Sequence, residues 1–171
     1  GWKRYPVHAN NIGVPELTPD QKKNKAVQTI LHPLPANTTF TTTLSFHNLR
    51  EIELGAVLWG LMWGNVHAAT HRHSIGMGKP FGFGQITFLL KATKLRANDK
   101  DVNAIPAAAA LIQVFAEHMK VHINGWAESP QLVNLLAMAN PVIGDDKTKR
   151  QFQGELKHMV MGMGESNEFV T

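Results

Sequence analysis

The order of elements in this chain is set by residues 38–63, which read TTFTTTLSFHNLREIELGAVLWGLMW. Apolar and hydroxyl side chains alternate over residues 38–46, and a period of two predicts a strand with one apolar and one polar face. From Glu53 to Trp63 nearly every residue is apolar, which indicates a helix that is buried on most sides. The stretch therefore predicts a strand followed by a helix that packs against a sheet.

The boundaries and packing of this helix are predicted from its polar and glycine positions. Asn48 is a suitable N-cap, and Glu51, three positions later, completes an approximate capping box, so we expect a helix over 49–63. Gly55 and Gly60 each cost a helix about 1 kcal/mol relative to Ala. We therefore expect both glycines to allow close packing of a neighbouring element.

A glycine-rich loop follows and leads into a second expected strand at 85–93. The loop reads Ile75-Gly76-Met77-Gly78-Lys79-Pro80-Phe81-Gly82-Phe83-Gly84. Successive backbone amides in such a loop can form a nest that binds an anion; the alternative is a tight turn packed on the following strand. Its glycine spacing differs from that of a Walker A loop and of a dinucleotide fingerprint, and it opens a strand where the fingerprint opens a helix. Nucleotide hydrolysis and dinucleotide redox chemistry are therefore disfavoured.

Aromatic side chains in the two segments have different expected roles. Trp59 and Trp63 stand at helical spacing and are expected to pack in the core. Phe81 and Phe83 alternate with glycines in the loop, so either they stack on nucleic-acid bases or they are buried beneath the loop.

The rest of the chain is expected to be loop or helix. Residues 1–24 are punctuated by prolines and asparagines, and residues 26–32 fit a short strand. Apolar periodicity predicts helices over 107–121 and 128–139, and a weaker one over 148–161. Strands and helices in this order favour the α+β class.

Composition limits the class of protein. The chain has 171 residues, 43% of them hydrophobic and 18% charged, which is typical of about one globular domain. Its net charge of +4 favours an anionic partner. The absence of cysteine excludes disulfides and thiolate chemistry and favours a reducing cytoplasm. No apolar run approaches the roughly 20 residues of a membrane span, and no signal-peptide pattern occurs, so we expect a cytoplasmic protein without a membrane partner.

The histidines are the remaining candidates for chemistry. His67, His71 and His73 lie close together, but no nearby carboxylate adds a metal ligand, so we expect a solvated or RNA-facing cluster. His118 and His122 share a helix face but lack the glutamate of a His-Glu-x-x-His site, so we interpret them as helix-surface residues. No serine lies in a Gly-x-Ser-x-Gly elbow. No catalytic residue, metal or cofactor is therefore assigned.

Three blocks of the sequence together resemble a known signature. They are Phe46-His47-Asn48-Leu49, Glu53-Leu54-Gly55-Ala56-Val57-Leu58-Trp59 and the glycine loop of residues 75–84. In this order they resemble the C-terminal signature of the RAMP superfamily of CRISPR-associated proteins. Weaker similarity to one subset of that family extends the match over most of the chain, at Gly1-Trp2-Lys3-Arg4-Tyr5, Trp126-Ala127-Glu128-Ser129 and Asn167-Glu168-Phe169.

The resemblance implies a ferredoxin-like, RRM-like fold, in which helices cover one face of an antiparallel sheet. Residues 1–97 would then be a partial or reduced domain of this kind, and residues 98–171 a C-terminal helical extension. A complete ferredoxin-like unit has four strands and two helices. The first half of the unit is therefore expected outside this chain, or the first 35 residues supply a reduced version.

The resemblance also implies a function and its residues. Family members bind CRISPR RNA in antiviral ribonucleoproteins together with other CRISPR-associated subunits, and many polymerise along the guide, which allows a homo-oligomer along the RNA here. We expect Lys79 near phosphate, with Arg72 and His73 as helpers and Lys3 and Arg4 as lesser contacts. The loop glycines expected to shape the RNA surface are Gly76, Gly78, Gly82 and Gly84. Two alternatives stay open: a metal-independent ribonuclease that uses a histidine, and a purely structural assembly subunit.

Overall fold

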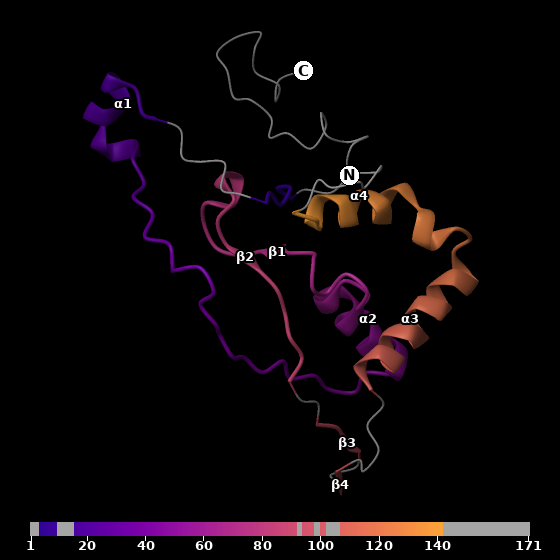
Figure 1. Cartoon of the computed structure of the whole chain (residues 1–171). Helices are drawn as coiled ribbons and strands as arrows, with labels where there is room; N and C mark the ends of the chain where they lie inside the picture. Colours follow the sequence, from indigo (N-terminus) through magenta and orange to yellow (C-terminus); the bar gives the residue numbers. More distant parts are fainter. Residues whose placement is uncertain (1–3, 10–15, 92–93, 98–99, 102–106, 142–171) are drawn as a thin grey trace. The chain divides into compact units, whose positions relative to one another are not determined.

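The computed structural model describes residues 4–9, 16–91, 94–97, 100–101 and 107–141 (Figure 1). The chain divides into two compact units that interleave along the sequence. The first unit consists of residues 1–38, 72–86 and 137–171, and the second of residues 39–71 and 87–136. The division expected between residues 97 and 98 stays a prediction. None of the helices in the described ranges is long and apolar enough to cross a membrane.

The second unit is organised by two packed helices, α2 (Glu51–Met62) and α3 (Ala108–His122). Their buried contact consists of four aliphatic side chains, Leu54, Leu58, Leu111 and Ile112. Gly55 lies against the backbone of α3, and an added Cβ there would lie 2.1 Å from the Leu111 carbonyl oxygen. The close packing expected at Gly55 is therefore confirmed. At Gly60 the expectation is wrong, because nothing lies within 4 Å of an added Cβ.

An aromatic cluster extends this core to the 3₁₀ turn η3 (Trp126–Glu128). The ring of Trp59 lies 6.1 Å from that of Phe115 and 5.6 Å from that of Trp126. Phe115 and Trp126 pack edge to face at 5.8 Å. Trp63, at the end of α2, is only 4% exposed. The expected packing of Trp59 and Trp63 is therefore confirmed.

The start of α2 differs from the expectation. Asn48 has a φ of 56°, which is not the extended conformation of an N-cap, and Arg50 takes that position instead. The Glu53 carboxylate accepts hydrogen bonds from the Arg50 backbone amide at 2.8 Å and from its guanidinium at 2.9 Å. The expected cap at Asn48 with Glu51 is thus wrong by two residues.

The other helices agree with the periodicity of the sequence. The structure has α3 at Ala108–His122 and α4 at Pro130–Ala139, within two residues of the expected boundaries. The helix expected over 148–161 lies outside the described residues. Helices combined with small antiparallel sheets confirm the α+β class.

The expected strands are formed only in part. Residues 38–46 alternate in sequence as expected for a strand, but they form no strand pairing with any part of the chain that the structure describes. Of the second expected strand, the described residues form only β2 (Gln85–Ile86), which pairs with β1 (His73–Ser74). A further two-stranded sheet joins β3 (Arg96–Ala97) to β4 (Lys100–Asp101). A strand depends on a partner for its backbone hydrogen bonds, so alternation alone overestimated the sheet.

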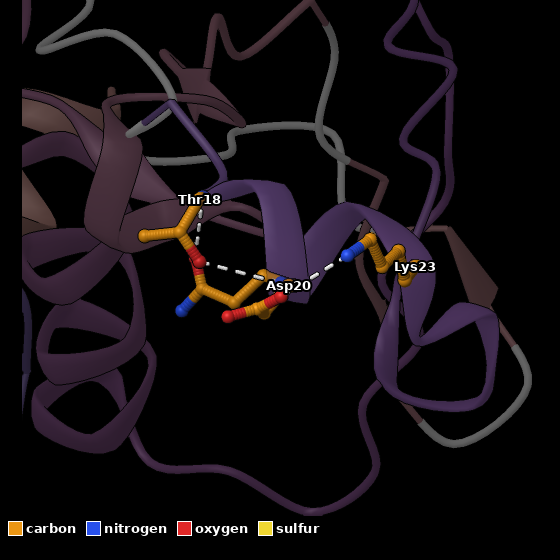
Figure 2. Close-up of polar contacts among 4 residues, drawn as sticks. Thr18, Asp20 and Lys23 are labelled. Atoms are coloured by element: carbon orange, nitrogen blue, oxygen red, sulfur yellow. Dashed lines mark hydrogen bonds and ion pairs between the residues drawn. The ribbon is translucent and has the colours of Figure 1, made fainter.

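The strand expected over 26–32 is also absent: helical turns occupy residues 19–23 and 25–27, and residues 28–32 form neither helix nor strand. Helix α1 (Pro19–Lys23) is followed by the 3₁₀ turn η1 (Lys25–Val27). The Thr18 hydroxyl accepts from the Gln21 amide at 3.3 Å, and the Gln21 side chain accepts from the Thr18 amide at 2.9 Å. Figure 2 shows this capping box and the Asp20–Lys23 ion pair of 3.4 Å.

The first unit has a small core of its own around the base of the β1–β2 hairpin. The Arg72 amide donates to the Ala139 carbonyl, and the Val7 amide donates to the Met138 carbonyl, both at 2.8 Å. Val7, Ala137 and Ala139 are at most 3% exposed. These contacts hold the N-terminal segment and the end of α4 beside the base of the hairpin.

Candidate nucleic-acid interface

The glycine loop is the closed end of the β1–β2 hairpin. His73 is paired with Ile86 and Ser74 with Gln85, and the Ile75 amide donates to the Gly84 carbonyl at 2.9 Å. Gly84 has a φ of 70°, and a Cβ at this position would lie 1.9 Å from the Ile75 carbonyl oxygen. The hairpin therefore closes only with glycine at residue 84.

Part of the loop is a tight turn whose backbone amides donate hydrogen bonds to carbonyls of the same loop. The 3₁₀ turn η2 (Lys79–Phe81) lies between two glycines in the left-handed conformation, Gly78 and Gly82. The Phe81 and Phe83 amides donate to the Gly78 carbonyl, at 2.9 and 3.3 Å, and the Gly82 amide donates to Lys79 at 3.1 Å. These three amides are therefore used within the loop, as the tight-turn alternative expects.

The backbone amides in the preceding part of the loop, residues 76–79, are not used in this way. Within the part of the chain that the structure describes, the backbone amides of residues 76–79 have no acceptor. Gly76 and Met77 are exposed, and Gly78 and Lys79 are half-buried. Four successive amides of this kind are the donors that an anion-binding nest requires. The loop thus combines a self-satisfied turn with a short row of donors at its tip.

The Lys79 ammonium lies at the same tip. It donates a hydrogen bond to the Gly76 carbonyl, three residues earlier. An ammonium carries three N–H donors, so this bond leaves two for another acceptor. The contact keeps the positive charge of Lys79 at the tip of the hairpin, on the Gly76 carbonyl.

The remaining expected basic residues lie at the other end of the hairpin. The Arg4 guanidinium donates to the Arg72 carbonyl at 3.4 Å, and His73 begins β1. Burial lowers the pKa of Arg4, but a guanidinium remains charged at neutral pH. Arg4, Arg72 and His73 are therefore close together at the base, while Lys79 is at the tip. Lys3 lies outside the described residues.

Charge is divided unequally between the two units. In their described residues, the second unit carries six basic and five acidic side chains, whereas the first carries six basic and only two acidic ones. The acidic residues of the first unit are Glu16 and Asp20, and its basic residues are Arg4, Lys22, Lys23, Lys25, Arg72 and Lys79. The unit that contains the glycine hairpin therefore carries most of the positive excess.

Two residues that support the loop were not predicted. The Gln85 side-chain amide donates to the His8 carbonyl at 2.9 Å and to the Gly82 carbonyl at 3.1 Å. Leu31 packs on the loop, because its Cδ1 lies 3.1 Å from a Cβ built on Gly78. The position of Gln85 directly after the last loop glycine is a signal that could have been used, whereas no sequence signal indicated Leu31.

The two loop phenylalanines are both half-buried. Phe83 packs against the backbone of its own loop, because its ring lies 3.0 Å from a Cβ built on Gly78. This contact favours the buried alternative for Phe83. For Phe81 the choice between stacking and burial stays open.

The histidine cluster is only partly assembled. The rings of His67 and His71 lie 4.3 Å apart, and His71 is 5% exposed, with the Thr70 hydroxyl 3.0 Å from its Nδ1. His73 belongs to the other unit. Within the described ranges, no group of three or more histidine or carboxylate side chains is arranged to hold a metal ion.

Comparison of the chain with models of known protein families, with curated proteins and with solved structures gave no match. The family resemblance accordingly rests on the sequence alone, on the blocks of residues 46–49, 53–59 and 75–84 and on the weaker similarity at residues 1–5, 126–129 and 167–169.

Proposed function

We propose that this chain is an RNA-binding subunit or domain of a CRISPR-associated ribonucleoprotein and holds guide RNA in antiviral defence. The observation that supports it best is the tip of the hairpin, where the amides of residues 76–79 have no acceptor among the described residues and the Lys79 ammonium donates to the Gly76 carbonyl. Phosphate oxygens only accept hydrogen bonds, so such a group of donors fits an RNA backbone.

The charge of the first unit supports the same proposal. Its described residues include six basic and only two acidic side chains, and such a positive excess attracts a polyanion. Arg4, Arg72 and His73 at the base would extend the contact along the strand. The partners in this proposal are CRISPR RNA and other CRISPR-associated subunits in the cytoplasm, with additional copies of the chain along the RNA.

The finer fold assignment belongs to this proposal. In the ferredoxin-like, RRM-like fold that the resemblance implies, helices would cover one face of an antiparallel sheet. The alternation of residues 38–46 and the RAMP-like blocks of sequence support this arrangement.

The test is the binding of single-stranded RNA over a range of salt concentrations. Each phosphate contact on a single strand contributes about 0.7 to the slope of log affinity against log salt. Lys79→Ala should weaken binding at low salt and reduce that slope by about 0.7. Lys120→Ala is the matched control, because it removes a lysine from the second unit that already pairs with Glu117 at 2.9 Å, and it should leave the slope unchanged.

Other results would decide against the proposal. If the folded chain does not bind RNA at low salt, or if both lysine variants behave alike, the hairpin is not the RNA site. Cleavage of labelled RNA that is lost in His71→Ala or His73→Ala would support the ribonuclease alternative. Assembly by size-exclusion chromatography that is independent of RNA would support a structural subunit.

A further inference from the structure

A pair of histidines occupies the last turn of α3 and is not used by the proposed function. His118 and His122 stand four residues apart, both are exposed, and their ring centroids lie 4.1 Å apart. The helical backbone fixes the spacing of the two Cα atoms, so both imidazoles project from the same face. The two rings are therefore held close together without depending on any other segment of the chain.

This spacing fits chelation of one metal ion. Imidazole nitrogens bind Zn²⁺ at about 2.0–2.1 Å, so two of them on adjacent coordination positions lie about 3 Å apart. Rings whose centroids are 4.1 Å apart reach that geometry by small rotations of the side chains. The partial negative charge at the C-terminus of a helix also favours a cation there. We propose that His118 and His122 form a two-histidine chelating site for a divalent transition-metal ion, independently of any RNA binding.

The surroundings indicate how many ligands the protein supplies. Glu117 is the nearest carboxylate in the sequence, but its Oε1 accepts hydrogen bonds from Lys120, at 2.9 Å, and from Gln113. The site therefore provides two nitrogen ligands, and water completes the coordination. Nitrogen and oxygen ligands in an open arrangement suit Cu²⁺ and Ni²⁺, and the affinity order of divalent ions puts Cu²⁺ first.

A second pair of histidines in the chain has the same spacing. His67 and His71 are also four residues apart, with ring centroids 4.3 Å apart. In that pair, however, His71 is 5% exposed, packs 5.9 Å from the Trp63 ring and has the Thr70 hydroxyl 3.0 Å from its Nδ1. The buried His71 ring gives an ion little access, whereas both α3 histidines are exposed. The exposed pair on α3 is therefore the preferred site.

The experiment is a titration of the ¹⁵N-labelled chain with Cu²⁺, which broadens the signals of nearby amides because it is paramagnetic. At substoichiometric Cu²⁺, the amides of residues 117–123 should broaden first, and Mg²⁺ should have no effect. Calorimetry should show weaker Cu²⁺ binding by His122→Ala. Mutations outside the first coordination shell already cost about 10- to 100-fold in metal affinity, so loss of a ligand should cost at least tenfold.

His67→Ala is the matched control and should leave this affinity unchanged. Both α3 histidines are exposed, so alanine should not disturb the helix, and circular dichroism checks this. Broadening that begins at residues 67–73, an equal loss of affinity in His67→Ala, or unchanged Cu²⁺ binding in the His118→Ala, His122→Ala double variant would each overturn the proposal.

Discussion

Gly55 lies directly against the backbone of Leu111, so that a Cβ at residue 55 would be 2.1 Å from the Leu111 carbonyl oxygen and 3.1 Å from the Phe115 Cβ. This contact sets the distance between α2 and α3. Because the nearest atom is backbone, a larger residue at position 55 cannot be accommodated by a change of side-chain conformation alone.

Gly55→Ala should therefore destabilise the second unit. Overpacking of this kind costs about 1–3 kcal/mol, measured as the free energy of unfolding in urea. Gly60→Ala is the control on the same helix, since nothing lies within 4 Å of its added Cβ. That variant should be more stable by about 0.5–1 kcal/mol, as expected for alanine in place of glycine in a helix. Equal effects of the two variants would contradict the close contact.

The Glu53 carboxylate should titrate below its ordinary range. Hydrogen bonds from the Arg50 side chain and from its backbone amide lower the pKa of Glu53. A lowered pKa in the folded state means that the stabilisation is present above the ordinary glutamate pKa of about 4.3 and is lost as the pH falls through the folded-state pKa.

A ¹³C NMR titration of the Glu53 carboxyl measures this shift directly. Arg50→Gln should move the titration midpoint of Glu53 upward, because it removes the guanidinium donor. If the Glu53 midpoint were the same with and without Arg50, the side-chain contact would not exist in solution.

Gly84→Ala should open the hairpin. A left-handed conformation costs a residue with a Cβ about 1–2 kcal/mol, and here the Cβ would also collide with the Ile75 carbonyl oxygen. Hydrogen exchange of the Ile75 amide, which donates to Gly84, should become faster. Gly76→Ala has the same left-handed strain but open space around the Cβ, so it should preserve the protection of Ile75.

Trp126→Leu should destabilise the aromatic cluster while keeping an apolar side chain. The ring of Trp126 packs against Trp59 and Phe115, and each aromatic pair contributes about 0.5–1.5 kcal/mol beyond the burial of its area. The expected loss in free energy of unfolding is therefore about 1–3 kcal/mol. Trp126→Phe should recover part of it, and a loss as large as in the leucine variant would argue against specific ring packing.

Helices were predictable here because their signal is local. Nearly every residue of α2 after Glu53 is apolar, and the apolar residues of α3 recur at a helical period; both helices form within about two residues of the expected positions. The capping residue was not predictable, because Asn48 with Glu51 and Arg50 with Glu53 have the same spacing. Only the positive φ of Asn48 excludes the first pair.

Strands and the candidate site were less predictable because they depend on distant residues. Residues 38–46 have the required alternation, but a strand also needs a hydrogen-bonding neighbour, which a sequence pattern does not supply. The glycines of the loop indicated a turn, yet the pattern did not specify which amides the turn would use. The bond from Lys79 to Gly76 and the support from Leu31 likewise arise only when the loop closes.

The segment that includes residues 39–47 has a consequence for solubility. Residues 26–49 contain no Lys, Arg, Asp or Glu, and Phe40 and Leu44 are 72% and 58% exposed. Natural sheets protect open edges with charges, proline or bulges. An exposed alternating segment that lacks such protection promotes aggregation. The chain should therefore form oligomers as its concentration rises, and a single gatekeeper charge, as in Thr42→Lys, should keep it monodisperse in light scattering.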